Sequence, residues 1–356
     1  MMILLGVLFF ALLIIAHEYG HYKVAKRNGV EVEEFGIGFP PRLFSKKVGD
    51  TLYSFNLIPL GGFVKLKGES TSSEEPGGFG ASSLRVKTKI LLAGVGMNVV
   101  AAIVIVAVLA LVGLPKILPN QFSIEANETI ASSHVVAAQV IEGSAADEAG
   151  ITSGDGVLAI NDIDITSAEM LSETTASLSG EEVSINVLRS GEEVVVNTVL
   201  GTDPDEGYLG VLPVDLESSR YTWAAPIVAV GLTFQMIGLV LVAVWDILSG
   251  LFTATAGEAV DQLVGPVGIV FLLQNLGELG LSYLILLIAS ISVSLAVFNA
   301  LPIPALDGGR LFLILAAKSM RKNLTEKVEN AVHGLGFVLL MGLFILITYV
   351  DVQRFF

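Results

Sequence analysis

The chain of 356 residues is 53% hydrophobic and only 15% charged, and its mean hydropathy is strongly positive. This composition excludes a single water-soluble globule and predicts a polytopic membrane protein. Cysteine is absent, which excludes disulfides, thiolate metal sites and cysteine nucleophiles, so any metal must be held by His, Asp or Glu.

The formal net charge of −15 is concentrated in one region of the chain. Residues 120–222 contain 19 acidic and two basic residues, whereas the remainder is close to neutral. We therefore expect one acidic soluble domain inserted into a membrane scaffold. The sequence has no basic footprint of the kind that binds nucleic acid, so no nucleic-acid partner is expected.

The first apolar run, about residues 2–24, is long enough to cross a bilayer, and we interpret it as a retained span. Near its end, His17 and His21 are separated by one helical turn and share a face. Glu18 follows the first histidine, as in the H-E-x-x-H zinc motif, where it acts as general base toward a water. A merely structural H-E-x-x-H is the alternative, but ionisable groups inside lipid are costly and usually functional.

Residues 31–67 contain short β-prone pieces broken by glycine and proline, which predict a membrane-associated β-hairpin region. We expect it to fold back toward the zinc motif and to offer a strand edge to an extended substrate through the stretch that contains Gly61, Gly62 and Phe63. A plain cytoplasmic hairpin is the alternative. Residues 68–83, rich in Gly, Ser and Glu, are predicted to form a mobile loop.

A second uncharged run, about residues 90–114, predicts another span and completes an N-terminal membrane half, residues 1–118. Eleven basic residues lie between His21 and this run, so the motif is expected near the cytoplasmic face and the N-terminus outside. Gly94 and Gly96 are expected to allow close helix packing. Asn98 either lines the site or, as the simpler interpretation, packs between helices.

The acidic region, about residues 124–216, is predicted to be an extracytoplasmic α+β domain. Residues 140–161 indicate a strand, a short helix, a Gly-Asp turn and a second strand, and alternating apolar residues continue to position 211. The string from Ser144 to Ile165 resembles a bacterial PDZ domain, a module that accepts a peptide by strand addition. A size-excluding plug is the alternative. His134 is expected to be a surface or core histidine.

Residues 224–275 are predicted to form a membrane-surface helical segment, because a crossing by the apolar run 226–255 would place the following site on the wrong side. The C-terminal membrane half, residues 279–356, then has spans at about 281–306 and 331–350. Four transmembrane helices are expected in all. His333, at the start of the last span, is interpreted as an interfacial histidine.

The third span ends in Asn299-Ala300-Leu301-Pro302-Ile303-Pro304-Ala305-Leu306-Asp307-Gly308-Gly309. Its prolines unwind a helix, which is tolerable in a membrane only where other groups satisfy the freed carbonyls. Asp307 is predicted to be the third zinc ligand, with the fourth position left to water, and a helix cap is its alternative role. Asn299 is expected to bind the substrate backbone or, alternatively, to pack between helices.

Together these motifs resemble the site-2 protease family of intramembrane zinc metalloproteases, in particular the bacterial regulator-of-sigma-E-protease branch, here with room for a single PDZ domain. The resemblance implies one Zn²⁺ per chain held by His17, His21 and Asp307, Glu18 as the catalytic base, and substrate contacts from Asn299 and the Gly61–Gly62 hairpin. One departure is Val95, which stands where many relatives have proline and so leaves the local bend of the second span open.

The resemblance also implies a bacterial cytoplasmic-membrane protease in regulated intramembrane proteolysis. Its expected substrates are transmembrane segments of single-span proteins, such as anti-sigma factors already trimmed by an upstream protease, or remnant signal peptides. Both termini and the PDZ-like domain are expected outside. Two alternatives remain open from the sequence: a non-enzymatic membrane receptor that senses peptides, and an ion transporter with an intramembrane His–Asp relay.

Overall fold

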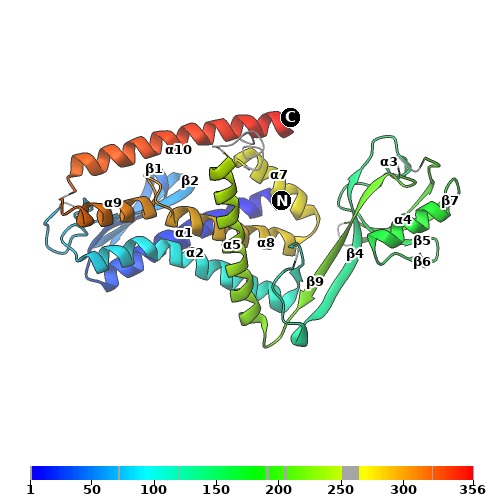
Figure 1. Ribbon diagram of the computed structural model, residues 1–356, viewed down its shortest axis with the longest axis horizontal. Helices are drawn as coiled ribbons and strands as arrows, with labels where there is room; N and C mark the ends of the chain where they lie inside the picture. Colours follow the sequence, from blue (N-terminus) through cyan, green and yellow to red (C-terminus); the bar gives the residue numbers. More distant parts are fainter. Residues whose placement is uncertain are drawn as a thin grey trace. The chain divides into compact units, whose positions relative to one another are not determined.

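The computed structural model describes residues 2–70, 73–118, 120–189, 192–203, 207–250, 264–322 and 324–355 (Figure 1). Five helices in this part of the chain are long and apolar enough to cross a membrane. They are α1 (Met2–Arg27), α2 (Leu84–Val112), α5 (Ala225–Gly250), α8 (Leu281–Ala300) and α10 (Glu326–Phe355). The shorter helices α7 (Pro266–Glu278) and α9 (Asp307–Ser319) flank α8 in the sequence.

The apolar surfaces of these helices are only partly covered by protein. In the apolar 18-residue stretch of each helix, the share of residues that are buried ranges from 11% in α10 to 50% in α8. Large side chains such as Leu335, Val338 and Leu339 on α10 are more than 60% exposed. Apolar surface of this extent is stable in contact with lipid and not with water, so the chain is a multi-pass membrane protein.

Helix α5 is one candidate span more than the four that the sequence predicts. It covers most of segment 226–255, which the sequence analysis places on the membrane surface, while residues 251–255 lie outside the described residues. Length and composition alone make α5 a candidate for crossing. Its surface location therefore stays a prediction.

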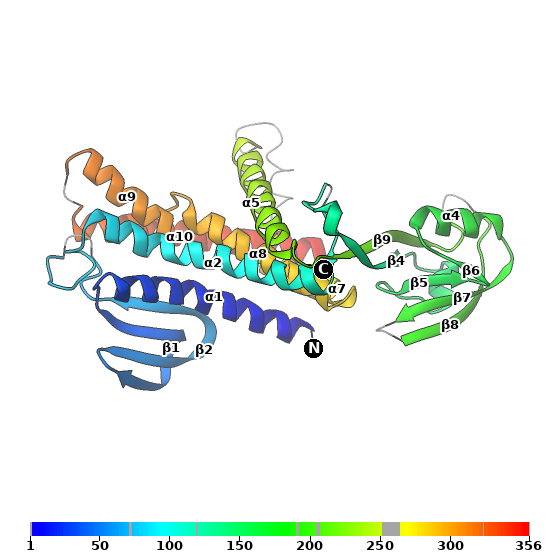
Figure 2. The same ribbon diagram turned by 90° about the horizontal axis from the view of Figure 1, so that it is seen from below.

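The described residues divide into two compact units, and the first contains residues 1–105, 233–271 and 288–356. Its sheet is formed by β1 (Val32–Val48) and β2 (Thr51–Leu66), which lie along α1 (Figure 2). Both strands bend, so that segment 32–37 pairs with residues 52–55 on one side and with residues 62–66 on the other. Segment 62–66 is consequently an edge of this sheet among the described residues.

The predicted mobile loop 68–83 has an anchor that its composition did not indicate. Phe79 is fully buried in a core cluster with Val32, Leu66 and Ile90, and its backbone N–H donates to the Lys67 carbonyl over 2.8 Å. Burial of one aromatic side chain stabilises a segment by roughly 1.5–3 kcal/mol. The described part of the loop is therefore attached to the sheet and to α2, and its mobility stays a prediction.

The second unit contains residues 106–232 and 272–287, and it includes the predicted acidic domain 124–216. Its seven-stranded antiparallel sheet has the order β3-β9-β4-β5-β7-β8, with β6 paired to β5. The strands are β3 (Leu114–Pro115), β4 (Thr129–Val140), β5 (Gly156–Ile160), β6 (Ile163–Asp164), β7 (Glu182–Arg189), β8 (Glu192–Val199) and β9 (Val211–Arg220). Helices α3 (Ala145–Glu148) and α4 (Ala168–Ser177) begin at the side-chain caps Ser144 and Ser167, as favourable N-cap residues do.

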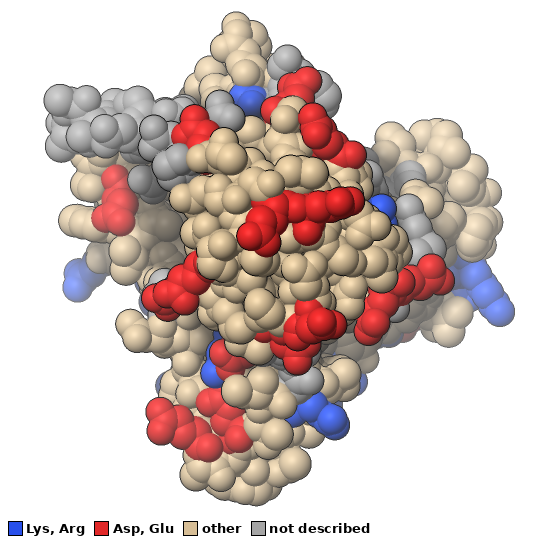
Figure 3. All heavy atoms as spheres, turned by 90° about the vertical axis from the view of Figure 1, so that its right-hand side faces the viewer, with Lys and Arg blue, Asp and Glu red and all other residues tan. Residues whose placement is uncertain are grey.

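The core of this unit contains alternate residues of the strands, including Val157, Ile185 and Val187, with Leu171 from α4. The acidic side chains lie outside this core, and they outnumber basic ones on the face that Figure 3 shows. The architecture is the α+β arrangement that the sequence predicts. The PDZ-like identity of the domain stays a prediction.

One acidic group of this unit is buried and paired. Asp155 is 3% exposed at its side chain, and its carboxylate accepts hydrogen bonds from Arg189 Nη2 at 2.6 Å and from the Thr152 backbone at 2.8 Å. Burial alone would raise the pKa of Asp155, but these hydrogen bonds outweigh it and hold the pKa below its usual value of 3.8. The ionised carboxylate therefore stabilises the folded domain.

We expect Asp155→Asn to lower the stability of this sheet at neutral pH by about 1.5–3 kcal/mol, the range for hydrogen bonds to a charged group. Because the folded-state pKa is depressed, the wild-type advantage is complete well above pH 3.8 and disappears as the pH falls through the folded value. Hydrogen exchange of β5 and β7 amides in the full-length protein measures this difference in stability. If the stabilities of the two proteins changed with pH in the same way, the stabilising role of the ionised Asp155 carboxylate would be contradicted.

Candidate metal centre

Helix α1 presents two histidines on one face near its C-terminal end. The Nε2 atoms of His17 and His21 are 3.2 Å apart, and the two rings meet edge to face with centroids 4.8 Å apart. The side chains are 12% and 11% exposed. The helical spacing that the motif predicts therefore brings both imidazole nitrogens to one point.

A turn between α8 and α9 brings Asp307 to the same point. Helix α8 ends at Ala300, and Ala305 has a positive φ of 77° before α9 begins at Asp307. Gly308 and Gly309 allow α9 to pack directly on the backbone of this turn, because a Cβ atom at either position would lie 2.0–2.4 Å from a carbonyl oxygen. Proline, glycine and the left-handed residue together form a tight turn, so that α9 begins beside the last residue of α8.

The Oδ2 atom of Asp307 lies 3.2 Å from Nε2 of His17 and 3.2 Å from Nε2 of His21. The three donor atoms form a triangle with nearly equal sides, in a group that could hold a metal ion. With zinc–ligand distances of about 2.0–2.1 Å, two ligand atoms of a tetrahedral site lie about 3.3 Å apart. The triangle therefore has the size of one face of a tetrahedral zinc site.

The donor chemistry fits the same ion. Oδ2 of Asp307 is buried and receives no hydrogen bond of good geometry from any described residue, although two imidazoles face it. A buried carboxylate oxygen without a hydrogen bond is costly unless a cation satisfies it. Two imidazoles and one carboxylate, with one position left open, are also the ligand set of catalytic zinc sites.

Helix α2 supports both histidines from behind. His21 Nδ1 donates to the carbonyl of Ile90 over 2.7 Å, which leaves Nε2 with its lone pair for a metal. Nδ1 of His17 lies 3.2 Å from the side-chain nitrogen Nδ2 of Asn98, and Oδ1 of this fully buried residue has no partner among the described residues. Asn98, for which packing was the simpler expectation, thus contacts a candidate ligand.

The close approach of α1 and α2 depends on glycine. A Cβ atom at Gly94 would lie 2.4 Å from His21 Nε2 and 2.6 Å from His17 Nε2, and one at Gly20 would lie 2.5 Å from the Ala93 carbonyl oxygen. Helix α2 runs without a break from Leu84 to Val112, so Val95 at the family's proline position is accommodated in a continuous helix. No sequence signal beyond small-residue spacing points to the contact of Gly94 with the histidines.

Glu18 and the edge of the sheet share a cavity of about 250 Å³ with the three candidate ligands. Val64, Leu66 and Asn299 also line it, and the backbone of Val64 hydrogen-bonds to the Glu18 carboxylate. Gly62 approaches Glu18 closely, since a Cβ atom there would lie 3.3 Å from Glu18 Cγ. The structure therefore places Glu18, Asn299 and Gly62 beside the ligands.

Two other residues predicted to bind substrate lie elsewhere on the sheet. Gly61, with a φ of 89°, packs against the Phe39 ring, and the Phe63 ring covers Gly36. Neither Gly61 nor Phe63 is among the described residues that line the cavity. Their contacts are with other residues of the β1–β2 sheet and not with the candidate ligands.

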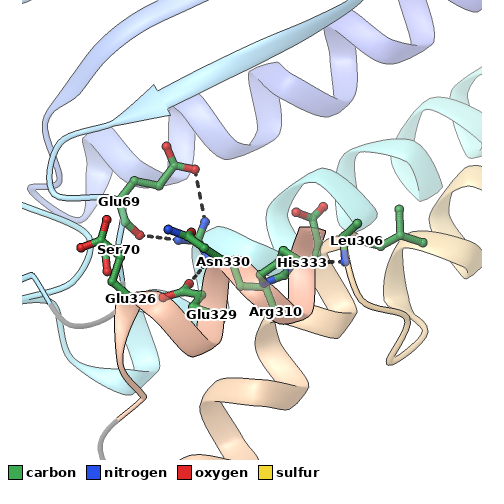
Figure 4. Close-up of a pocket in the computed structure, with 10 residues that line it drawn as sticks. Glu69, Ser70, Leu306, Arg310, Glu326, Glu329, Asn330 and His333 are labelled. Atoms are coloured by element: carbon green, nitrogen blue, oxygen red, sulfur yellow. Dashed lines mark hydrogen bonds and ion pairs between the residues drawn. The ribbon is translucent and has the colours of Figure 1, made fainter. Parts of the chain in front are cut away.

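Arg310 of α9, for which the sequence analysis predicts no role at the site, lines this cavity and connects three segments (Figure 4). Its guanidinium pairs with Glu329 of α10 at 3.0 Å, bonds to the side chain and backbone carbonyl of Glu69, and lies 4.7 Å from the centroid of the Phe79 ring. A second, polar cavity of about 520 Å³ adjoins it between α9, α10 and the loop.

Known proteins of similar sequence identify the family of this chain. Residues 5–343 match the model of peptidase family M50. A protein of Clostridium perfringens is 34% identical over 352 residues, covering 99% of this chain and 98% of the relative. The zinc metalloprotease RasP of Shouchella clausii is 28% identical over 437 residues, covering 98% of this chain and 97% of the relative.

The match extends through all the segments that carry the site, and it confirms both the family that the sequence resembles and the zinc cofactor that the H-E-x-x-H spacing predicts. The chain belongs to peptidase family M50, the site-2 protease family, and is a zinc metalloprotease.

Proposed function

We propose that this metalloprotease hydrolyses peptide bonds within the transmembrane segments of single-span membrane proteins. The observation that carries the proposal is the 3.2 Å triangle of His17 Nε2, His21 Nε2 and Asp307 Oδ2. It lies at the ends of helices that are apolar and long enough for a membrane, with a carboxylate beside it. A hydrolytic centre in this setting acts on bonds that lie in the bilayer.

In this proposal His17, His21 and Asp307 hold zinc, and Glu18 is the general base. Bound zinc supplies a Lewis acid that polarises the scissile carbonyl and makes a water more acidic. Glu18 accepts a proton from the attacking water as the new C–O bond forms, and it returns that proton to the amide nitrogen as the C–N bond breaks. The cavity that Glu18 shares with the ligands supports this role.

The edge segment 62–66 is proposed to hold the substrate in an extended form. It pairs with segment 32–37 on one side only, and Val64 and Leu66 line the cavity. A helical substrate hides its carbonyls in hydrogen bonds, so strand addition would expose the scissile bond while satisfying the backbone groups. Asn299 lines the same cavity and is proposed to contact the same backbone, although its Nδ2 also donates to the Leu295 carbonyl within α8.

We further propose that the active site lies near the cytoplasmic face of a bacterial cytoplasmic membrane, with both termini and the acidic domain outside. The basic residues that follow α1 and α9 support this orientation. The acidic domain would act as a PDZ-like peptide-binding module or as a filter against bulky ectodomains. Anti-sigma factors trimmed by an upstream protease and remnant signal peptides are the proposed substrates in regulated intramembrane proteolysis.

Glu18→Gln should abolish cleavage of a tagged single-span substrate and leave zinc stoichiometry unchanged, because Gln cannot accept the proton although the three ligands remain. Cleavage in proteoliposomes and metal analysis of the same preparation measure both effects. His17→Ala is the matched control and should lose zinc as well as activity. Wild-type cleavage by the Glu18→Gln protein would exclude the proposed base.

Gly94→Ala should weaken zinc binding about 10–100-fold, because the added methyl group collides with the ligand nitrogens of both histidines. Gly96→Ala on the same helix is the control, since a Cβ atom there meets nothing within 4 Å. Competition against a chromophoric chelator gives both affinities. Equal zinc affinities in the two variants would show that α2 does not constrain the histidines.

A further inference from the structure

One face of α10 contacts the segment that carries Asp307. Glu329, His333 and Gly336 are four and three residues apart, a spacing that places them on the same side of a helix. Each of them meets a different part of residues 304–310: Glu329 pairs with Arg310, His333 bonds to Ala305, and Gly336 touches Pro304. The rest of α10 is largely exposed.

The contact of His333 is a hydrogen bond to a strained position. Its Nδ1 accepts the backbone N–H of Ala305 over 3.0 Å, and Ala305 has a φ of 77°, in the left-handed region that non-glycine residues rarely adopt. Since Nδ1 is the acceptor, the ring proton is on Nε2, which is buried without a hydrogen-bond partner among the described residues. Figure 4 shows His333 reaching the backbone next to Leu306.

Gly336 lets the backbone of α10 contact the same turn. A Cβ atom at Gly336 would lie 2.4 Å from Pro304 Cβ and 2.6 Å from the Pro304 carbonyl oxygen. Gly308 and Gly309 of α9 also pack against the backbone, at Ala300 and Ile303. Backbone from α9 and from α10 thus contacts the turn, and the hydrogen bond from His333 of α10 reaches it at Ala305, two residues before Asp307.

We propose that His333 is a positioning residue for the third zinc ligand. By accepting the Ala305 N–H it holds the left-handed turn, and the turn sets where α9 begins and so where the Asp307 carboxylate points. This role differs from the one that the sequence suggests, which is that of a histidine at the membrane interface. The proposal rests on the ligand role of Asp307 in the proposed function.

The test compares zinc affinity in full-length variants purified in the same detergent. His333→Leu removes the acceptor, whereas His333→Asn keeps one, because the asparagine Oδ1 can occupy the place of Nδ1. Leu335→Ala, at a 63% exposed neighbouring position, is the control. Chelator competition reports the affinity, and the visible spectrum of the Co²⁺-substituted protein reports the ligand geometry.

We expect His333→Leu to lower zinc affinity about 10–100-fold, as loss of a group that orients a metal ligand does, and to change the cobalt spectrum. His333→Asn and Leu335→Ala should both resemble wild type. Should His333→Leu fail to fold, Gly336→Ala replaces it, because that change displaces Pro304 while keeping the histidine, and the same loss of affinity is expected.

Wild-type zinc affinity and an unchanged cobalt spectrum in His333→Leu would overturn the proposal. Equal losses in His333→Leu and His333→Asn would overturn it as well, since they would show that the hydrogen-bond acceptor is not what matters. Asp307→Ala tests the ligand role of Asp307 separately from the positioning role of His333. If that variant binds zinc like wild type, the ligand assignment itself fails, whereas loss of zinc there with retention in His333→Leu rejects the positioning role alone.

Discussion

Bringing two imidazoles and a carboxylate together at the end of apolar helices is the constraint on which the rest of the first unit depends. Polar groups of this kind are expensive to remove from water unless each is paired. The outward nitrogens of His17 and His21 are met by Asn98 and by the Ile90 carbonyl, whereas the inward atoms face one another with Asp307 Oδ2 lacking a hydrogen bond among the described residues. Burying these polar groups is therefore favourable when they bind a cation, and without a cation it is costly in free energy.

Close contact between backbones makes this arrangement possible. Inside a membrane, helix association has little hydrophobic driving force and relies on tight packing of small residues. Gly20 and Gly94 bring α1 and α2 together at the histidines, and Gly308 and Gly309 do the same between α9 and the preceding turn. A Cβ atom at any of these positions would lie 2.0–2.5 Å from a neighbouring atom, so the packing at that position would have to change. The glycines of this chain thus serve the metal centre as well as the fold.

Local motifs made much of the site predictable. H-E-x-x-H indicates two candidate ligands by helical spacing alone. Asp307 after two prolines indicated the third candidate, because a helix broken inside a membrane usually marks a functional site. The contacts of Gly94, Asn98 and His333 were not predictable, since each depends on which helices pack together and no residue type marks that choice. Phe79 in a Gly- and Ser-rich loop was missed for the same reason. For α5, hydropathy cannot distinguish a crossing helix from one that lies on the surface.

The separation of the candidate ligands along the sequence affects how the protein is made. His17 and His21 belong to α1, whereas Asp307 follows α2, the acidic domain and α8 in the sequence and is therefore synthesised after them. Until that residue has emerged and its turn has formed, the centre lacks one donor. Biosynthesis itself therefore delays completion of the candidate metal centre until α8 and the turn that follows it have been made.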